Sequence, residues 1–309
     1  MLDAAIVGLG RWGRTLVDSA RASERIRFVR EIDPAVAPAG RLADVLADPA
    51  VRAVVLATPH SLHREQVIAS AQAGKHVFCE KPFALRAADA RAMIAACRRA
   101  GVVLAVGHNR RFWPAMRELK RLVAEVRLGQ VLHVEGHNSN ENSNRITGGW
   151  RTNPDESPGG GLTGAGLHVL DAFVSLCGPL RRVYARLTTH RKDVPPLDTL
   201  CALYEFADGT SGTLATVRAT PFYWRVHVFG SAGSAEVLGE TGLVLRLSGK
   251  SPERMTLEPQ DSVRAELEAF ADAVEGGAPY PVPSDQILAT VSAFEATVRS
   301  VDTGETTAI

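Results

Sequence analysis

Short apolar runs alternate with amphipathic stretches through the first third of the chain. Residues 4–7, 26–32, 51–57, 75–79 and 102–106 have the composition of strands buried on both faces. Helical patterns separate them at residues 14–20, 63–73 and 87–100, and Gly101 follows the last of these as a helix-ending residue. Strands that alternate with helices predict an α/β fold, here a Rossmann-type doubly wound parallel sheet.

A glycine-rich turn joins the first predicted strand to the first predicted helix. In the sequence G-L-G-R-W-G at residues 8–13, Gly8 permits the tight turn, Gly10 lets a pyrophosphate approach the backbone, and Gly13 lets the helix pack closely. The second strand ends at Asp33, where an acid can accept hydrogen bonds from both adenosine ribose hydroxyls. Glu31 is an alternative acid, since it alternates with Asp33 along the strand.

The acid at the end of the second strand also predicts the cofactor. Asp33 would repel a 2′-phosphate and no arginine follows it directly, so we predict NAD in preference to NADP. The residues expected to contact the cofactor in this segment are Gly8, Gly10, Arg11, Trp12, Gly13 and Asp33.

The segment after Asp33 is shorter than a full dinucleotide-binding domain requires. Pro34, Pro38, Gly40 and Pro49 interrupt it, which leaves room only for one short helix near residues 41–47. We therefore predict that the third, edge strand is missing, which would open the adenine side of the pocket.

The pattern changes in the second half of the chain. After a helix near residues 114–123, strand-like runs occur at residues 131–134, 182–187, 201–205, 212–217, 224–229, 234–238 and 243–247. Turn signals at residues 207–209 and 231–233 are typical of antiparallel hairpins. Helices at residues 263–274 and 284–301 would cover one face of the sheet, and partner subunits are expected to cover the other. We predict a dinucleotide-binding domain at residues 1–117 and an α+β substrate-binding and oligomerisation domain at residues 118–309, with a largely antiparallel open-faced sheet.

Composition excludes several classes of partner. The chain has 309 residues, of which 45% are hydrophobic and 22% charged, and its formal net charge is +1. This balance gives no reason to expect nucleic acid or an anionic membrane as a partner. The four cysteines lie far apart and predict free thiols rather than a metal site. Because the chain opens directly on a strand pattern without a signal peptide, we expect a soluble, cytoplasmic protein.

Further motifs occur in a characteristic order along the chain. They are A-T-P-H-S-L-H at residues 57–63, G-K-H-V-F-C-E-K-P at 74–82, G-H-N-R-R-F at 107–112, W-R at 150–151, G-G-G at 159–161 and G-L-H-V-L-D at 166–171. With the glycine-rich turn, they resemble the glucose–fructose oxidoreductase, inositol dehydrogenase and MocA (Gfo/Idh/MocA) family over nearly the whole chain. The resemblance implies an NAD(P)-dependent dehydrogenase or reductase that acts on CH–OH groups, assembled as a homodimer or homotetramer through its C-terminal sheet.

Lys81 is the first candidate catalytic residue. It lies just past the end of a predicted parallel strand, where open α/β sheets bind their ligands. Partial burial and a nearby oxidised nicotinamide, which is a cation, would lower the pKa of Lys81 toward a range useful for proton transfer. Glu80 is expected to support the local geometry or the cofactor, and the family often has a cis bond before Pro82.

His168 is the second candidate catalytic residue. It lies three residues before Asp171 on one face of a helix predicted at residues 162–176, so the acid can set the tautomer of the imidazole. In the family, a histidine here contacts the substrate hydroxyl. Many polyol-oxidising relatives carry an aspartate four residues earlier, where this chain has Gly164, which favours a roomier pocket and a less hydroxylated cyclic substrate.

The resemblance assigns weaker roles to residues in the remaining motifs. Expected near the nicotinamide ribose are Thr58, Pro59 and His63, with Glu80 and Lys81 also near the cofactor. Expected at the substrate are Lys81, Asn109, Arg110, Trp150, Arg151 and His168, of which Trp150 and Arg151 end a polar loop at residues 137–149.

Two functions follow from these predictions. The first is hydride transfer between NAD and a carbinol or carbonyl carbon of a small cyclic polyol, sugar or related diol. The alternative is a non-catalytic nucleotide- or sugar-sensing regulatory protein of the same fold, which the shortened segment after Asp33 and the glycine at residue 164 favour.

Overall fold

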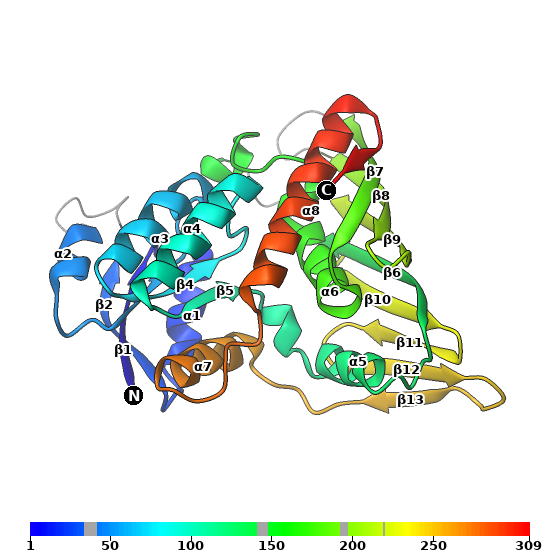
Figure 1. Cartoon of the computed structure of the whole chain (residues 1–309), viewed down its shortest axis with the longest axis horizontal. Helices are drawn as coiled ribbons and strands as arrows, with labels where there is room; N and C mark the ends of the chain where they lie inside the picture. The colour runs from blue at the N-terminus through cyan, green and yellow to red at the C-terminus, as the bar shows by residue number, and fades with distance from the viewer. Residues whose placement is uncertain (34–41, 141–147, 192–196, 219) are drawn as a thin grey trace. The chain divides into compact units, whose positions relative to one another are not determined.

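The computed structural model of the chain describes residues 1–33, 42–140, 148–191, 197–218 and 220–309 (Figure 1). The chain forms two compact units. The first comprises Met1–Phe112 and Asp261–Val291, and the second comprises Trp113–Gln260 and Ser292–Ile309.

In the described part of the first unit, five parallel strands form a sheet in the order β2-β1-β3-β4-β5. They are β1 (Leu2–Val7), β2 (Ile26–Ile32), β3 (Ala53–Leu56), β4 (His76–Glu80) and β5 (Leu104–Gly107). β3 is buried at every position, as expected for a central strand with helices on both faces. The predicted doubly wound parallel sheet is confirmed.

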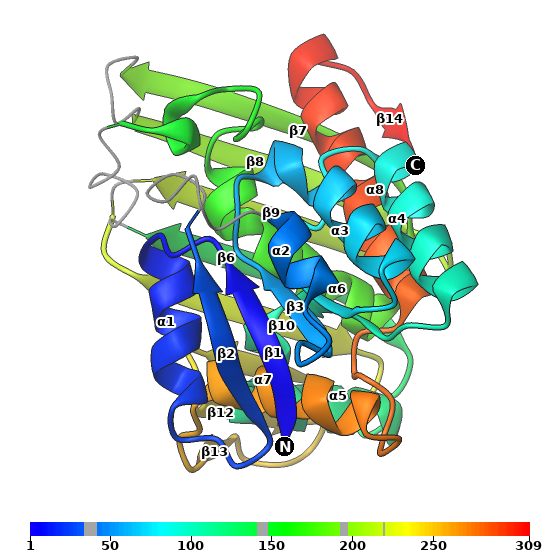
Figure 2. The same ribbon diagram turned by 90° about the vertical axis from the view of Figure 1, so that its left-hand side faces the viewer.

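Helices cover both faces of this sheet because the connections run in two directions from β1. The chain moves one way to β2 through α1 (Arg11–Ala20). It moves the other way from β3 to β5 through α3 (His63–Gln72) and α4 (Ala87–Ala100). Right-handed crossovers in opposite directions place α1 on one face and α3 and α4 on the other (Figures 1 and 2). Gly101 ends α4 at a φ of 65°, as predicted.

The segment after β2 contains the short helix that the sequence predicts, α2 (Leu42–Ala47). Within the part of the chain that the structure describes, β2 is an edge strand and has β1 as its one neighbour. Pro34, Pro38 and Gly40 lie outside the described residues.

A helix from the C-terminal part of the chain completes the first unit. α7 (Ser262–Val274) packs beside α1, and the Phe270 ring lies 5.8 Å from the Phe78 ring of β4, centroid to centroid. The Tyr280 hydroxyl donates a hydrogen bond of 2.9 Å to the Val106 carbonyl of β5. A single division at residues 117 and 118 therefore does not describe the packing, because α7 and the start of α8 (Ser284–Thr303) group with the first sheet.

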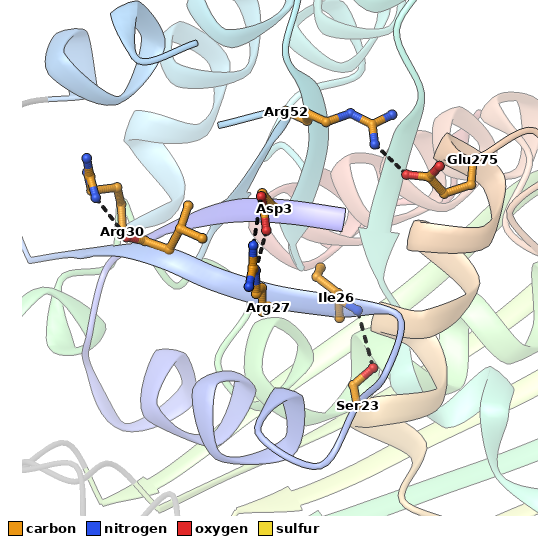
Figure 3. A network of polar contacts seen from close by, with 8 residues as sticks. Asp3, Ser23, Ile26, Arg27, Arg30, Arg52 and Glu275 are labelled. Carbon is orange, nitrogen blue, oxygen red and sulfur yellow. Dashed lines mark hydrogen bonds and ion pairs between the residues drawn. The ribbon is translucent and has the colours of Figure 1, made fainter. Parts of the chain in front are cut away.

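Ion pairs tie the amino-terminal edge of this sheet together (Figure 3). Arg27 of β2 bonds both carboxylate oxygens of Asp3 in β1, which lowers the pKa of Asp3. Arg52 reaches Glu275, at the end of α7, over 2.5 Å. The second pair joins segments far apart in the sequence and fixes the end of α7 beside the sheet.

Among the described residues, nine strands form the sheet of the second unit, in the order β13-β12-β11-β10-β6-β9-β8-β7-β14. Neighbours are antiparallel except β6 and β9, which are parallel. The strands are β6 (Val131–Asn140), β7 (Leu180–Arg191), β8 (Leu197–Phe206), β9 (Ser211–Arg218), β10 (Tyr223–Gly230), β11 (Gly233–Leu238), β12 (Gly242–Leu247), β13 (Glu253–Thr256) and β14 (Thr307–Ala308). Both predicted hairpins are confirmed, whereas the sequence patterns did not predict β13 and β14.

One face of this sheet carries the helices α5 (Pro114–Ala124), α6 (Leu167–Cys177) and the second half of α8 (Figure 1). Gly136 of β6 faces α6 so closely that a Cβ there would lie 2.1 Å from the Val169 side chain. The Tyr204 hydroxyl of β8 lies 3.1 Å from that of Thr297 in α8. Among the described helices, none is both long and apolar enough to cross a membrane.

Candidate active site

The glycine-rich turn has the close contacts that its sequence predicts. Gly8 follows β1 with a φ of 99°, and a Cβ there would lie 2.6 Å from the Ala57 carbonyl oxygen. A Cβ at Gly13 would lie 1.9 Å from the Gly8 carbonyl oxygen, so α1 can approach β1 only with glycine at this position. A Cβ at Gly10, the residue before α1, would meet no atom of the described residues within 4 Å. The turn is therefore tight on its inner side and open at Gly10.

This open side fits the pyrophosphate of a dinucleotide. The first N–H groups of α1 follow Gly10, and a helix N-terminus attracts anions. The indole Nε1 of Trp12 is buried and has no acceptor among the described residues. Gly10, Arg11 and Trp12 lie at this open side, and their contact with the phosphates stays a prediction, while Gly8 and Gly13 make the turn possible.

The end of β2 forms one wall of a cavity of about 310 Å³. Glu31 and Asp33 both line it, while the side chain of Ile32 between them is buried. The two acids alternate along the strand and line the same cavity, so both alternatives that the sequence offers for the ribose-binding acid lie at this cavity. Asp33 is half-buried and Glu31 exposed.

His63 connects two loops at the carboxyl edge of the first sheet. Its ring is fully buried, with Nδ1 2.9 Å from the Pro82 carbonyl oxygen and Nε2 3.1 Å from the Thr58 carbonyl oxygen. Carbonyl oxygens only accept, so a proton on Nδ1 links the start of α3 to the loop of Pro82, whereas a proton on Nε2 makes a local bond to Thr58. The Thr58 hydroxyl donates to Gln66 over 2.6 Å. Contact of Thr58, Pro59 and His63 with a ribose stays a prediction, and the geometry adds a holding role for His63.

Lys81 follows β4 at this same edge. Its backbone N–H donates to the Glu80 carboxylate over 3.1 Å, and the Lys81–Pro82 peptide bond is cis, as the family resemblance implies. Glu80 is buried against β5, where a Cβ on Gly107 would lie 2.5 Å from the Glu80 Oε1 atom. Glu80 therefore holds the backbone of Lys81, and glycine at 107 makes room for the carboxylate.

The segment after β5 packs against α7. The Asn109 side-chain amide donates to the Ser262 hydroxyl over 3.2 Å, and Arg111 donates to Gln286. Burial lowers the pKa of Arg110 to about 9, so its guanidinium stays protonated at neutral pH. Asn109 and Arg110 thus lie at the carboxyl end of β5, where the sequence placed them.

The second unit carries His168 and Asp171 on α6, one turn apart and both buried. The helix predicted at residues 162–176 is divided, because a π-helical turn (Leu162–Gly166) precedes α6. Such turns are rare and often occur at functional sites. Gly164 lies in this turn, is exposed, and a Cβ there would meet no atom of the described residues within 4 Å.

Buried polar side chains of the sheet fix the start of α6. The Asn138 amide of β6 donates to the Ala165 carbonyl over 2.8 Å. Asp198 of β8 accepts from the Gly161 N–H over 3.2 Å and lies 3.5 Å from Arg218. Burial raises the pKa of Asp198, and the Arg218 charge and the Gly161 hydrogen bond oppose that rise. The position of the π-helical turn is therefore set by polar groups underneath it.

Trp150 and Arg151 form a compact pair in the same unit. They lie in a 3-10 turn (Trp150–Thr152), and the Arg151 guanidinium carbon is 4.3 Å from the centroid of the Trp150 ring, a cation–π contact. The predicted loop at residues 137–149 is shorter than expected, because β6 extends to Asn140, and residues 141–147 lie outside the described residues.

The first unit thus brings together the glycine-rich turn, the two acids and the loop of Lys81, and the second unit brings His168 and Asp171 onto one helix. The sequence patterns did not predict the supporting residues Asn138 and Asp198. Polar residues at inward positions of alternating strands are the signal that could have found them.

Comparison with known proteins agrees with this architecture. Residues 2–108 match the family described as an oxidoreductase family with an NAD-binding Rossmann fold, and residues 116–236 match the GFO/IDH/MocA C-terminal domain. The chain is therefore an NAD(P)-binding oxidoreductase. It belongs to the Gfo/Idh/MocA family.

Several similar proteins are named for sugars or related compounds. The 1,5-anhydro-D-fructose reductase of Ensifer adhaerens is 30% identical over 85% of this chain and 81% of its own length. The D-xylose 1-dehydrogenase (NADP(+)) 2 of Haloferax volcanii is 30% identical over 84% of this chain and 81% of its own. The crystal structure of aldose-aldose oxidoreductase from Caulobacter crescentus, complexed with glycerol, is 26% identical, covers 100% of this chain and 99% of its own, and has a TM-score of 0.84. These relatives are all named as oxidoreductases, and the regulatory alternative finds no support among them.

Proposed function

We propose that this enzyme transfers a hydride between NAD and a carbinol or carbonyl carbon of a small cyclic polyol, sugar or related diol. The observation that carries the proposal is the place of Lys81. It lies at the carboxyl end of β4, with its backbone held by Glu80, in the unit that also contains the glycine-rich turn.

The bound nicotinamide supplies the acceptor or donor of the hydride. Lys81 hydrogen-bonds the substrate hydroxyl and takes its proton as the carbinol C–H bond breaks, so the alcohol becomes a carbonyl. His168, with Asp171 beside it on α6, is the second group for the same hydroxyl. Asn109, Arg110, Trp150 and Arg151 orient the rest of the substrate.

NAD is the proposed cofactor because two acids line the cavity at the end of β2. Glu31 and Asp33 offer carboxylates to ribose hydroxyls and repel an additional phosphate. The name of one relative includes NADP(+). The choice of NAD for this chain therefore rests on its own residues Glu31 and Asp33 and not on its relatives.

The glycine at position 164 bears on the class of substrate. The space beside it, with no carboxylate present, favours a cyclic substrate with fewer hydroxyl groups than inositol. Anhydro-sugars are such compounds, and a relative at 30% identity is named for one.

Turnover assays with Lys81→Met test the proposal. Purified protein is supplied with NAD and a panel of polyols, aldoses, anhydro-sugars and cyclic diols, and NADH formation is followed. We expect Lys81→Met to lower kcat at least about 100-fold, as for loss of a general acid–base group, with NADH affinity nearly unchanged. Lys250→Met, at an exposed lysine far along the sequence, is the matched control. Full turnover in Lys81→Met would contradict the proposal.

We also propose that the outer face of the nine-stranded sheet packs on a second copy of the chain. On this face Leu203 of β8 is 54% exposed and pairs in register with Tyr184 of β7, which is 38% exposed. Large exposed apolar side chains side by side favour a protein interface. Light scattering on Leu203→Asp should show a smaller assembly than the wild type, with Val126→Asp as a control outside the sheet. A wild-type monomer would contradict the proposal.

A further inference from the structure

The cavity beside the end of β2 has a second wall, formed by α1. Two arginines of this helix, Arg14 and Arg21, line it together with Glu31 and Asp33. No arginine follows Asp33 directly in the sequence, whereas the fold supplies arginines from the preceding helix.

The two arginines are held differently. Arg21 pairs over 2.9 Å with Asp18, three residues earlier on the exposed side of α1. Arg14 donates from Nε to the Leu9 carbonyl over 3.0 Å. Leu9 belongs to the glycine-rich turn, so this bond keeps the Arg14 guanidinium beside the turn and on the wall of the cavity that contains Asp33. The bond uses one of the five N–H donors of the guanidinium.

The acidic and the basic side chains of this cavity would have opposite effects on the 2′-phosphate of NADPH. A ribose that hydrogen-bonds to Asp33 would place its 2′-hydroxyl in this cavity. A phosphate on that hydroxyl would be repelled by the carboxylates of Asp33 and Glu31. It would be attracted by the guanidinium of Arg14, whose planar group suits bidentate bonding to phosphate.

We propose that Arg14 is the residue of this enzyme that recognises the 2′-phosphate of NADPH, and that Asp33 is the residue that limits its effect. The proposal rests on the proposed cofactor site. Because the arginine is already present, removal of the Asp33 carboxylate alone shifts the preference of the site toward NADPH.

Calorimetric titration of the full chain with NADH and NADPH tests this proposal. The proteins are the wild type, Asp33→Ser, Arg14→Ala, the double variant and Arg21→Ala. We expect Asp33→Ser to weaken NADH binding about tenfold and to tighten NADPH binding about tenfold, the size of one charge-assisted hydrogen bond. Adding Arg14→Ala should remove the gain for NADPH and leave NADH within about twofold of Asp33→Ser. Arg21→Ala, in the same cavity but paired with Asp18, should leave both affinities within about twofold.

The outcomes separate this inference from the proposed function. Failure of the wild type to bind either nucleotide would contradict the cofactor site and the inference with it. Normal NADH binding, with equal NADPH affinity in Asp33→Ser and in the double variant, would overturn the role of Arg14 and leave the proposed function intact. Loss of salt sensitivity of NADPH binding in Arg14→Ala would support direct contact between opposite charges.

Discussion

Two glycines provide space at the segments that carry the proposed catalytic residues. Gly107 gives the Glu80 carboxylate its place against β5, and Glu80 in turn holds the N–H of Lys81. Gly164 leaves space in the turn before α6. At both positions the missing side chain leaves this space, so substitution by a larger residue is the direct test.

Gly107→Ala should push the Glu80 carboxylate away from its present position. The added Cβ would lie 2.5 Å from Glu80 Oε1, which forces the side chain or β5 to move. We expect kcat to fall about tenfold or more, with NADH affinity less affected, because the glycine-rich turn lies on other strands. Gly148→Ala, where a Cβ meets no described atom within 4 Å, is the control. Unchanged kcat in Gly107→Ala would show that Glu80 does not position Lys81.

Gly164→Asp should restore the carboxylate that many polyol-oxidising relatives have. The described residues leave room for the new side chain, so the melting temperature should stay near that of the wild type. We expect oxidation of a polyol such as inositol to rise, on the order of tenfold, because the carboxylate would lie one turn before His168 and could accept its proton. The measurement is kcat/KM on inositol against an anhydro-sugar. Gly164→Asn, which has nearly the same size without the charge, should not show the rise, and equal behaviour of the two variants would contradict the argument.

At the scale of elements, the outer face of the second sheet holds a charged network around His227 of β10. Arg225 Nη2 lies 2.9 Å from His227 Nδ1 and its Nε bonds Glu236. An arginine only donates, so this contact keeps Nδ1 as an acceptor and favours the neutral imidazole. Burial lowers the pKa of His227 to about 4. The charge of Glu236 opposes that change, and the charges of Arg225 and Arg246 add to it.

This network predicts a pH dependence of stability. Between pH 6.5 and about 4 the unfolded chain binds a proton at His227 that the folded chain does not, so stability falls as the pH falls through this window. We expect His227 to contribute roughly 2 kcal/mol of this loss, after allowance for solvent screening.

Urea unfolding at several pH values measures this contribution. His227→Gln should reduce the loss between pH 6.5 and 4. It should not remove the loss, because burial also lowers the pKa of His76 and His137. An identical pH dependence in His227→Gln and the wild type would contradict the assignment.

At the scale of the whole molecule, the first unit is discontinuous in the sequence. Leu267 and Phe270 of α7 are fully buried in its core, and Tyr280 bonds β5. Burial of each such side chain is worth about 1.5–3 kcal/mol, and a domain is stable by only about 5–15 kcal/mol. Loss of α7 and the segment after it therefore removes a large share of the stability of this unit.

A fragment of residues 1–117 should consequently fail to fold cooperatively. A fusion of residues 1–112 to 261–291 through a short flexible linker should fold and bind NADH. The two ends lie close, because Asn109 bonds Ser262. Near-ultraviolet circular dichroism and NADH titration distinguish the two fragments. Native-like dichroism and cofactor binding by residues 1–117 alone would support the division predicted from the sequence.

Local patterns in the sequence determined most of the architecture of this protein. The apolar runs located β1 to β5, and the turn residues located the hairpins, because burial and backbone conformation are decided within a few residues. The spacing of Gly8, Gly10 and Gly13 determined the nucleotide-binding turn for the same reason.

Only the tertiary structure decided which distant residues share a surface. It put Arg14 and Asp33 on the walls of one cavity, placed α7 with the first sheet, and put Asn138 and Asp198 under the turn before α6. None of these contacts leaves a mark in a short window of sequence, because each joins elements whose proximity depends on strand order and crossover direction. The chain's own periodicity therefore predicts its elements, while the charge balance of the cavity beside β2 exists only once they have packed.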